Sequence, residues 1–96
     1  MEIKKEVQDG KTILIVSGRL DTITAPILEK EVKELEDNIC IQFDFASLNY
    51  ISSVGLRLLL VTQKRYGTNF SIKNVKAEVL EVLEMTGFAD IIKIEG

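Results

Sequence analysis

Two adjacent hydroxyl side chains, Ser52 and Ser53, are the residues of this 96-residue chain best placed to do chemistry. They stand between an apolar run, 39–45, and a run with helical periodicity, 54–66. Serine is favoured just before a helix because its oxygen accepts a hydrogen bond from a free backbone N–H group, so a helix cap is one interpretation. Regulatory phosphorylation is the other, because a helix start favours negative charge. The residues alone leave both interpretations open.

Catalytic chemistry has few candidate residues in this chain. Histidine, the commonest general base, is absent, and Cys40 is the single cysteine, so a Cys/His metal cluster is ruled out. Neither Gly-x-Ser-x-Gly nor a glycine-rich phosphate loop occurs. The carboxylates are scattered, and whether Asp21 and Asp44 converge in space is left open. We therefore expect a protein that is not an enzyme and that uses no cofactor and no metal.

Composition indicates a globular domain and not a nucleic-acid binder. Apolar residues make up 46% of the chain, charged residues 28%, and the net charge is −3. A general nucleic-acid binder would show a basic face. Cys40 lies in an apolar run, as expected of a packed thiol in a reducing compartment. The length and the absence of a linker-like stretch predict one domain, residues 1–96. No signal peptide and no membrane span is recognisable, so we expect this domain in the cytoplasm.

The elements that must position the two serines alternate between strand and helix. Asp9-Gly10 predicts a hairpin, Gly18 the end of the second strand, and Pro26 a helix that starts near Thr24 and is closed by residues 36–38. Alternation of strands and helices implies parallel crossovers. The sequence therefore predicts an α/β fold with a mixed, mostly parallel sheet and helices packed against it. The expected strands are 2–8, 11–17, 39–45, 69–73 and 91–94, and the later helices are 54–66 and 76–86.

Three finer expectations concern individual side chains. Asp44 should stand near the end of its strand, close to the serines, where it either orients their turn or accepts a neighbouring N–H group. Val54, Leu58 and Val61 form one of two apolar stripes expected on the helix 54–66. Asn74 is the alternative cap for the helix that starts near Lys76.

Four short segments together resemble the STAS domain, the fold of bacterial anti-sigma factor antagonists. The segment 52–56, Ser-Ser-Val-Gly-Leu, is similar to the family's Asp-Ser-Ser-Gly-Leu signature after a buried strand. Residues 18–21 resemble its Gly-x-Leu-Asp motif, 43–45 the acidic end of its central strand, and 86–88 its Thr-Gly-Leu step. Together these segments span nearly the whole chain, and they follow one another in the family's order with plausible spacing. The resemblance therefore implies the STAS fold.

The resemblance also implies a role for the serines. Aligned on Gly55-Leu56, Ser53 falls at the position that a partner kinase phosphorylates in the family. Ser52 then replaces the family's common Asp, and Val54 replaces its second Ser. In the family, the unmodified protein binds an anti-sigma serine kinase and frees the sigma factor, and phosphorylation releases the kinase.

The implied partners are an anti-sigma factor of the serine-kinase type and, as a further candidate, a phosphatase. For Thr22 a plain cap, and for Arg57 a solvated helix residue, remain alternatives to partner contact. A STAS domain can also act as a constitutive scaffold in a signalling or transport assembly, without phosphorylation. The expected partner-binding residues lie around the two helix starts: Asp21, Thr22, Ser52, Ser53, Val54 and Arg57.

Overall fold

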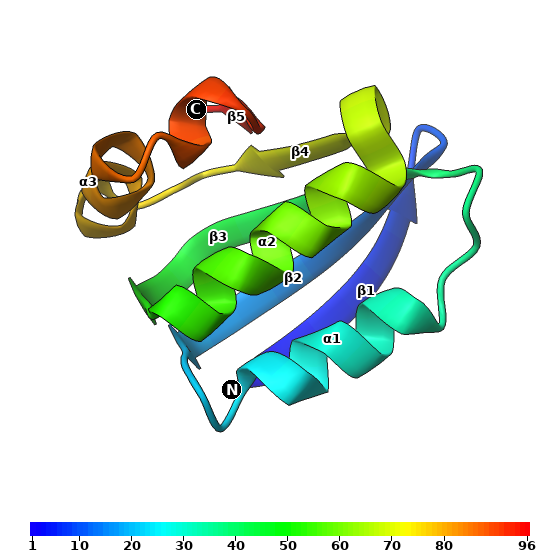
Figure 1. Cartoon of the computed structure of the whole chain (residues 1–96). Helices are drawn as coiled ribbons and strands as arrows, with labels where there is room; N and C mark the ends of the chain where they lie inside the picture. The colour runs from blue at the N-terminus through cyan, green and yellow to red at the C-terminus, as the bar shows by residue number, and fades with distance from the viewer.

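A five-stranded sheet with the order β1-β2-β3-β4-β5 forms the frame of the molecule (Figure 1). The computed structural model describes all 96 residues. β1 and β2 are antiparallel and the other neighbouring strands are parallel, so the predicted α/β class with a mixed, mostly parallel sheet is confirmed. The strands are β1 (Glu2–Gln8), β2 (Lys11–Leu20), β3 (Cys40–Ile51), β4 (Phe70–Lys73) and β5 (Lys93–Glu95), and the helices are α1 (Ala25–Lys33), α2 (Ser53–Tyr66) and α3 (Ala77–Met85).

The β1–β2 hairpin follows from its two turn residues. Asp9 and Gly10 both have positive φ angles, 51° and 78°, as the tightest two-residue hairpin turns require. The strands pair from Gln8 with Lys11 outward. The hairpin predicted from the sequence is confirmed.

One apolar core lies between the sheet and its helices. Leu14, Phe43 and Ile72 are neighbours in the register of β2, β3 and β4, and none of the three is exposed. Leu59 of α2 and Leu83 of α3 are equally buried in the same cluster. Figure 1 shows α1 and α2 side by side in front of the sheet. The starts of these two helices therefore lie over the same sheet face.

Strands β2 and β3 are longer than the sequence predicts. Gly18 does not end β2: it continues the strand with a φ angle of +94°, and pairing with β3 runs on to Leu20 opposite Ile51. Two register shifts accompany this extension. Because β3 continues to Ile51, Asp44 is paired with Ile15 in the first half of the strand and is not close to the serines, so that expectation is wrong.

The Asp44 carboxylate instead accepts hydrogen bonds from residues near it in the fold. Its Oδ1 accepts a hydrogen bond from the backbone N–H of Ala46 at 3.0 Å, which agrees with the interpretation as an acceptor for a nearby N–H group. The same oxygen accepts a bond from the amide of Asn74 at 3.2 Å. Asn74 has a φ of 58° and does not cap α3, whose N-cap residue, Lys76, makes no side-chain capping bond. The expected Asn74 cap is therefore wrong.

The predicted bounds of α2 and α3 agree with the structure to within one residue, and α1 differs only at its end. Thr24 is the N-cap residue of α1 and Pro26 lies in its first turn, as expected, but the helix ends at Lys33. In α2 the expected stripe is only partly correct, because Val54 and Val61 are 39% and 51% exposed whereas Leu58 is buried.

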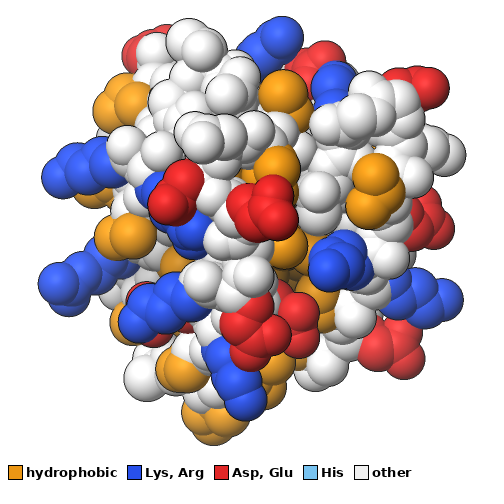
Figure 2. All heavy atoms as spheres, turned by 90° about the vertical axis from the view of Figure 1, so that its right-hand side faces the viewer, with side chains coloured by type: hydrophobic (Ala, Val, Ile, Leu, Met, Phe, Trp, Pro, Cys, Tyr) orange, Lys and Arg blue, Asp and Glu red, His pale blue; other side chains and the backbone are white.

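Charges of both signs are interspersed over the surface. Figure 2 shows Lys and Arg side chains alternating with Asp and Glu side chains on the face that it presents. None of the three α-helices is both long enough and apolar enough to cross a membrane.

Candidate functional site at the starts of α1 and α2

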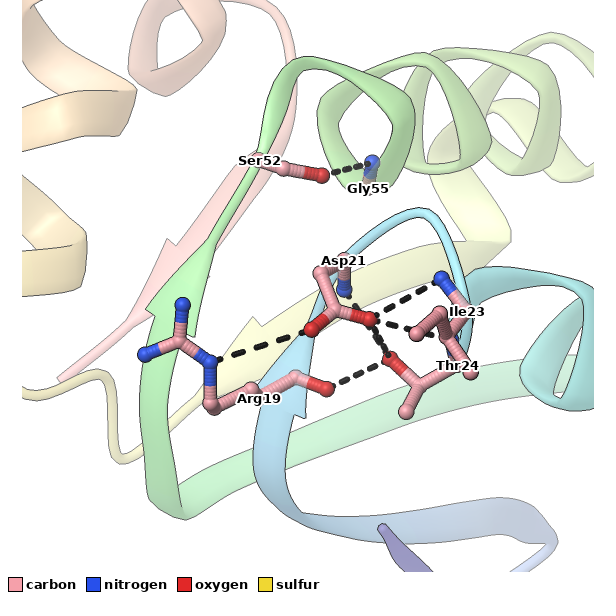
Figure 3. Close-up of polar contacts among 6 residues, drawn as sticks. All are labelled: Arg19, Asp21, Ile23, Thr24, Ser52 and Gly55. Atoms are coloured by element: carbon pink, nitrogen blue, oxygen red, sulfur yellow. Dashed lines mark hydrogen bonds and ion pairs between the residues drawn. The ribbon is translucent and has the colours of Figure 1, made fainter.

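Ser52 joins the end of β3 to the start of α2 as a helix cap. Its backbone is extended, with φ −97° and ψ 176°, and its Oγ accepts a hydrogen bond from the N–H of Gly55 at 3.3 Å (Figure 3). Its own N–H donates to the carbonyl of Leu20 at 2.9 Å, which ties this junction to the end of β2. The cap interpretation is therefore confirmed for Ser52, whose hydroxyl is already used in the fold.

Ser53 occupies the first position of α2 and is exposed. No hydrogen bond within the chain involves its hydroxyl, whereas that of Ser52 accepts from Gly55. The adjacent serines thus differ: one side chain holds the helix start, and the other faces solvent. Phosphorylation of Ser53 stays a prediction, and an exposed, unbonded hydroxyl is what a modifying enzyme needs.

Gly55 lets the start of α2 lie directly on the end of β2. A Cβ atom at this position would meet Cγ1 of Ile51 at 2.8 Å, Cγ of Leu20 at 2.9 Å and the Leu20 carbonyl oxygen at 3.0 Å. Real Cβ contacts are not that short, so only glycine fits without a shift of its neighbours. The close approach fixes where Ser52 and Ser53 stand relative to the α1 junction.

Asp21 organises the other junction, between β2 and α1. Its Oδ1 accepts hydrogen bonds from the N–H groups of Ile23 at 3.0 Å and Thr24 at 3.1 Å. In return, the Asp21 N–H donates to Oγ1 of Thr24 at 2.9 Å, and that hydroxyl donates to the carbonyl of Arg19 at 2.5 Å (Figure 3). The Thr24 N–H is the largest cause that lowers the pKa of Asp21 below its ordinary value of 3.8; partial desolvation opposes it, and the Thr24 hydroxyl, the Ile23 N–H and Arg19 add to it.

The two junctions are adjacent because Leu20 and Ile51 are paired in the sheet. Asp21 and Ser52 each follow one of these paired residues. Thr22 is exposed in the α1 junction and takes part in no side-chain hydrogen bond, so the plain-cap alternative for Thr22 is not what the structure has. Asp21 and Asp44 do not converge, because Asp21 follows the last pair of the β2–β3 ladder whereas Asp44 is paired with Ile15 in the middle of β2. No cluster of three or more Cys, Asp or Glu side chains could hold a metal ion.

A groove runs between α1 and α2 beside Ser53. Its volume is about 310 Å³, and its α2 wall includes Val54, Arg57 and Val61. Ala25, Pro26 and Glu29 of α1 form the opposite wall. Val54 and Arg57, two of the expected partner-binding residues, therefore line a surface hollow next to the exposed serine.

One exposed pair at this end of the sheet was missed in the sequence. The guanidinium of Arg19 lies over the ring of Tyr50, 4.1 Å from its centroid, and Arg19 Nε is 3.7 Å from Oδ2 of Asp21. Arg19 and Tyr50 meet only because the extended β2 and β3 pair there. No local pattern signals that extension.

The fold and the two helix starts define a class: a small α/β domain that presents a capped strand-to-helix junction with one free serine. Residues 2–96 match the model of the STAS domain family. The chain belongs to this family, and the resemblance seen in the sequence is confirmed.

The relatives of this chain include regulators of sigma factors. It is 28% identical to the anti-sigma-B factor antagonist of Bacillus subtilis, over 100% of this chain and 94% of that protein. It resembles the crystal structure of an anti-sigma factor antagonist from Mycobacterium paratuberculosis with a TM-score of 0.88 and 25% identity, over 97% of this chain and 83% of that one. The Bacillus cell fate determinant SpoIIAA in its phosphorylated form shares the fold at a TM-score of 0.72 and 15% identity, over 99% and 92% of the two chains.

Proposed function

We propose that this protein is an anti-sigma factor antagonist whose binding to an anti-sigma factor of the serine-kinase type is switched by phosphorylation of Ser53. The observation that carries the proposal is the contrast between the two serines. Ser52 is engaged in the helix cap, whereas Ser53 is exposed and unbonded at the start of α2. The antagonist names of its relatives support the class of partner.

The proposed binding surface consists of the two junctions and the groove between α1 and α2. Asp21, Thr22 and Ser52 form the rim at the junctions. Ser53 and Val54 begin α2, and Arg57 follows one turn later; Val54 and Arg57 line the groove. Asp21 is rigidly held by its two N–H bonds, so it would act by orienting the α1 start as well as by contact. Such a rigid rim needs no refolding to meet a partner.

Phosphorylation would change the binding surface without unfolding the domain. A phosphate adds a charge of about −1.5 to −2, and a helix N-terminus stabilises negative charge by roughly 0.3–1 kcal/mol. The folded domain therefore tolerates a phosphate on Ser53, and the unfavourable free energy arises only when the partner binds. A dianion pressed against an apolar or acidic partner surface costs a few kcal/mol, which lowers affinity about a hundredfold or more. The protein therefore acts by binding, in the cytoplasm where sigma factors work, and a phosphatase would reset it.

The test is a comparison of variants that differ only at Ser53. The affinity of the unmodified chain for the anti-sigma factor of its own organism is measured by calorimetry beside Ser53→Ala and Ser53→Asp. We expect Ser53→Ala to bind within about threefold of the unmodified chain and Ser53→Asp about a hundredfold more weakly. Lys64→Gln, which lowers the net charge by the same one unit at an exposed position farther along α2, is the matched control and should bind normally.

The competing role is a constitutive scaffold of a signalling or transport assembly. It predicts equal affinities for Ser53→Ala and Ser53→Asp, because Ser53 would then be only part of a structural turn. Equal affinities would therefore contradict the phosphorylation switch and support the scaffold role.

A further inference from the structure

Arg57 is an unpaired cation one helical turn from Ser53. Helix α2 contains Arg57, Lys64 and Arg65 and no acidic residue. The ion pairs of the chain use Arg19, Lys33 and Arg65, so the guanidinium of Arg57 has no carboxylate partner. It is exposed and lines the groove between α1 and α2. The charge beside the serine is therefore free to pair with a new anion.

The spacing of Ser53 and Arg57 favours contact between them. Residues i and i+4 of a helix have Cβ atoms about 5–6 Å apart, and an acidic group N-terminal to a basic one is the better orientation. Long helical side chains also lean toward the N-terminus, so Arg57 covers the turn that begins at Ser53. A guanidinium offers phosphate oxygens two parallel N–H donors.

We propose that phosphoserine at position 53 pairs with Arg57 within the same helix and thereby withdraws the cation that lines the groove. The proposal rests on the proposed modification of Ser53 and adds the residue through which it acts. In the unmodified chain Arg57, between the exposed Val54 and Val61, offers a positive charge on an apolar wall. In the modified chain the same wall carries a net negative pair.

Two carboxylates also face this region and must be separated from the effect of Arg57. Glu29 of α1 lines the groove and lies 3.7 Å from Lys33, and Asp21 stands at the neighbouring junction. Both would raise the pKa of a phosphate on Ser53, and Arg57 would lower it. Because the carboxylates stay in every variant, a difference between variants isolates Arg57.

The experiment installs the phosphate without a kinase. The full chain is produced with genetically encoded phosphoserine at position 53, and the second ionisation of the phosphate is titrated by phosphorus NMR at 0.1 M salt. We expect Arg57→Gln to raise this pKa by about 0.3 units, the size of an exposed i, i+4 pair. Lys64→Gln removes an equal charge about 16 Å from position 53 along the helix axis, beyond the screening length of about 10 Å, and should leave the pKa of the phosphate unchanged.

The opposite result is equally clear. If the second pKa of the phosphate is the same in Arg57→Gln, in Lys64→Gln and in the parent chain, the pair does not form and the proposal is overturned. Arg57→Lys, which keeps the charge and the helix, should retain most of the effect; a pKa equal to that of Arg57→Gln would also overturn a charge-based pair. Since neither kinase nor partner is present, failure here is distinct from failure of the switch itself.

Discussion

At the scale of single residues, the division of labour between Ser52 and Ser53 is the feature on which the function depends. Both are serines, and local sequence does not say which side chain is free. The structure separates them by one hydrogen bond, from Gly55 to Ser52. Stability and binding should therefore respond to different serines.

Ser52→Ala should lower the free energy of unfolding by about 0.5–2 kcal/mol, because it removes the acceptor that caps α2. Ser53→Ala removes an exposed hydroxyl without a partner and should change stability by less than about 0.5 kcal/mol. Urea unfolding followed by circular dichroism measures both. Equal losses for the two variants would contradict the assignment of the cap to Ser52.

Gly55→Ala should destabilise the protein by about 1–3 kcal/mol, because the new methyl group overlaps Ile51 and Leu20 at the tightest contact of the junction. Ser53→Thr adds a methyl group at an exposed position of the same helical turn and is the control, with an expected change under about 0.5 kcal/mol. Thermal unfolding compares the two. A neutral Gly55→Ala would mean that α2 can lift off β2 at little cost.

At the scale of elements, α1 and α2 are locked together at the end opposite to the site. Arg65 of α2 donates to the carbonyls of Val32 at 2.8 Å and Leu35 at 2.5 Å, and its Nε lies 2.8 Å from Oδ1 of Asp37. Val32 lies in the last turn of α1, and Leu35 lies two residues beyond the end of the helix at Lys33. The Val32 carbonyl also accepts a hydrogen bond from the N–H of Leu35 at 3.1 Å. The Arg65 side chain thus connects α2 to the end of α1 and to the loop that follows it.

Arg65→Ala should cost about 1.5–3 kcal/mol of stability, the usual range for the loss of hydrogen bonds that involve a charged group. The adjacent Lys64→Ala is a matched control because Lys64 is exposed and unpaired, and it should be close to neutral. Chemical denaturation of both variants makes the comparison. An Arg65→Ala variant as stable as Lys64→Ala would show that the contacts of Arg65 with the end of α1 do not stabilise the fold.

The elements also show where sequence reasoning succeeds. Asp9-Gly10 and Pro26 act through their own backbone angles, so the hairpin and the start of α1 could be read from neighbouring residues. The length of β3 could not, because its polar end, Ser47 to Ile51, is a strand only through pairing with β2. Gly18 was predicted to end β2, because the neighbouring residues do not reveal that the strand goes on pairing with β3. Its positive φ is accommodated inside a strand whose partner continues.

At the scale of the whole molecule, the sheet brings two loops together that are some thirty residues apart in the sequence. The bond from the N–H of Ser52 to the carbonyl of Leu20 joins them at 2.9 Å. The six expected site residues could therefore be proposed from motifs, and most of them do gather at the two helix starts. The groove of α1 and α2 and the Arg19–Tyr50 contact were not predictable, because both depend on how distant elements pack.

The most direct test of the central claim is to find where a kinase places phosphate on this chain. The protein is incubated with the anti-sigma kinase of its own organism and ATP, and the modified residue is mapped by mass spectrometry in the parent chain, Ser52→Ala and Ser53→Ala. The account predicts one phosphate on Ser53 in the first two proteins and none in Ser53→Ala. Phosphate on another residue, or a parent chain that binds the kinase and stays unmodified, would contradict it.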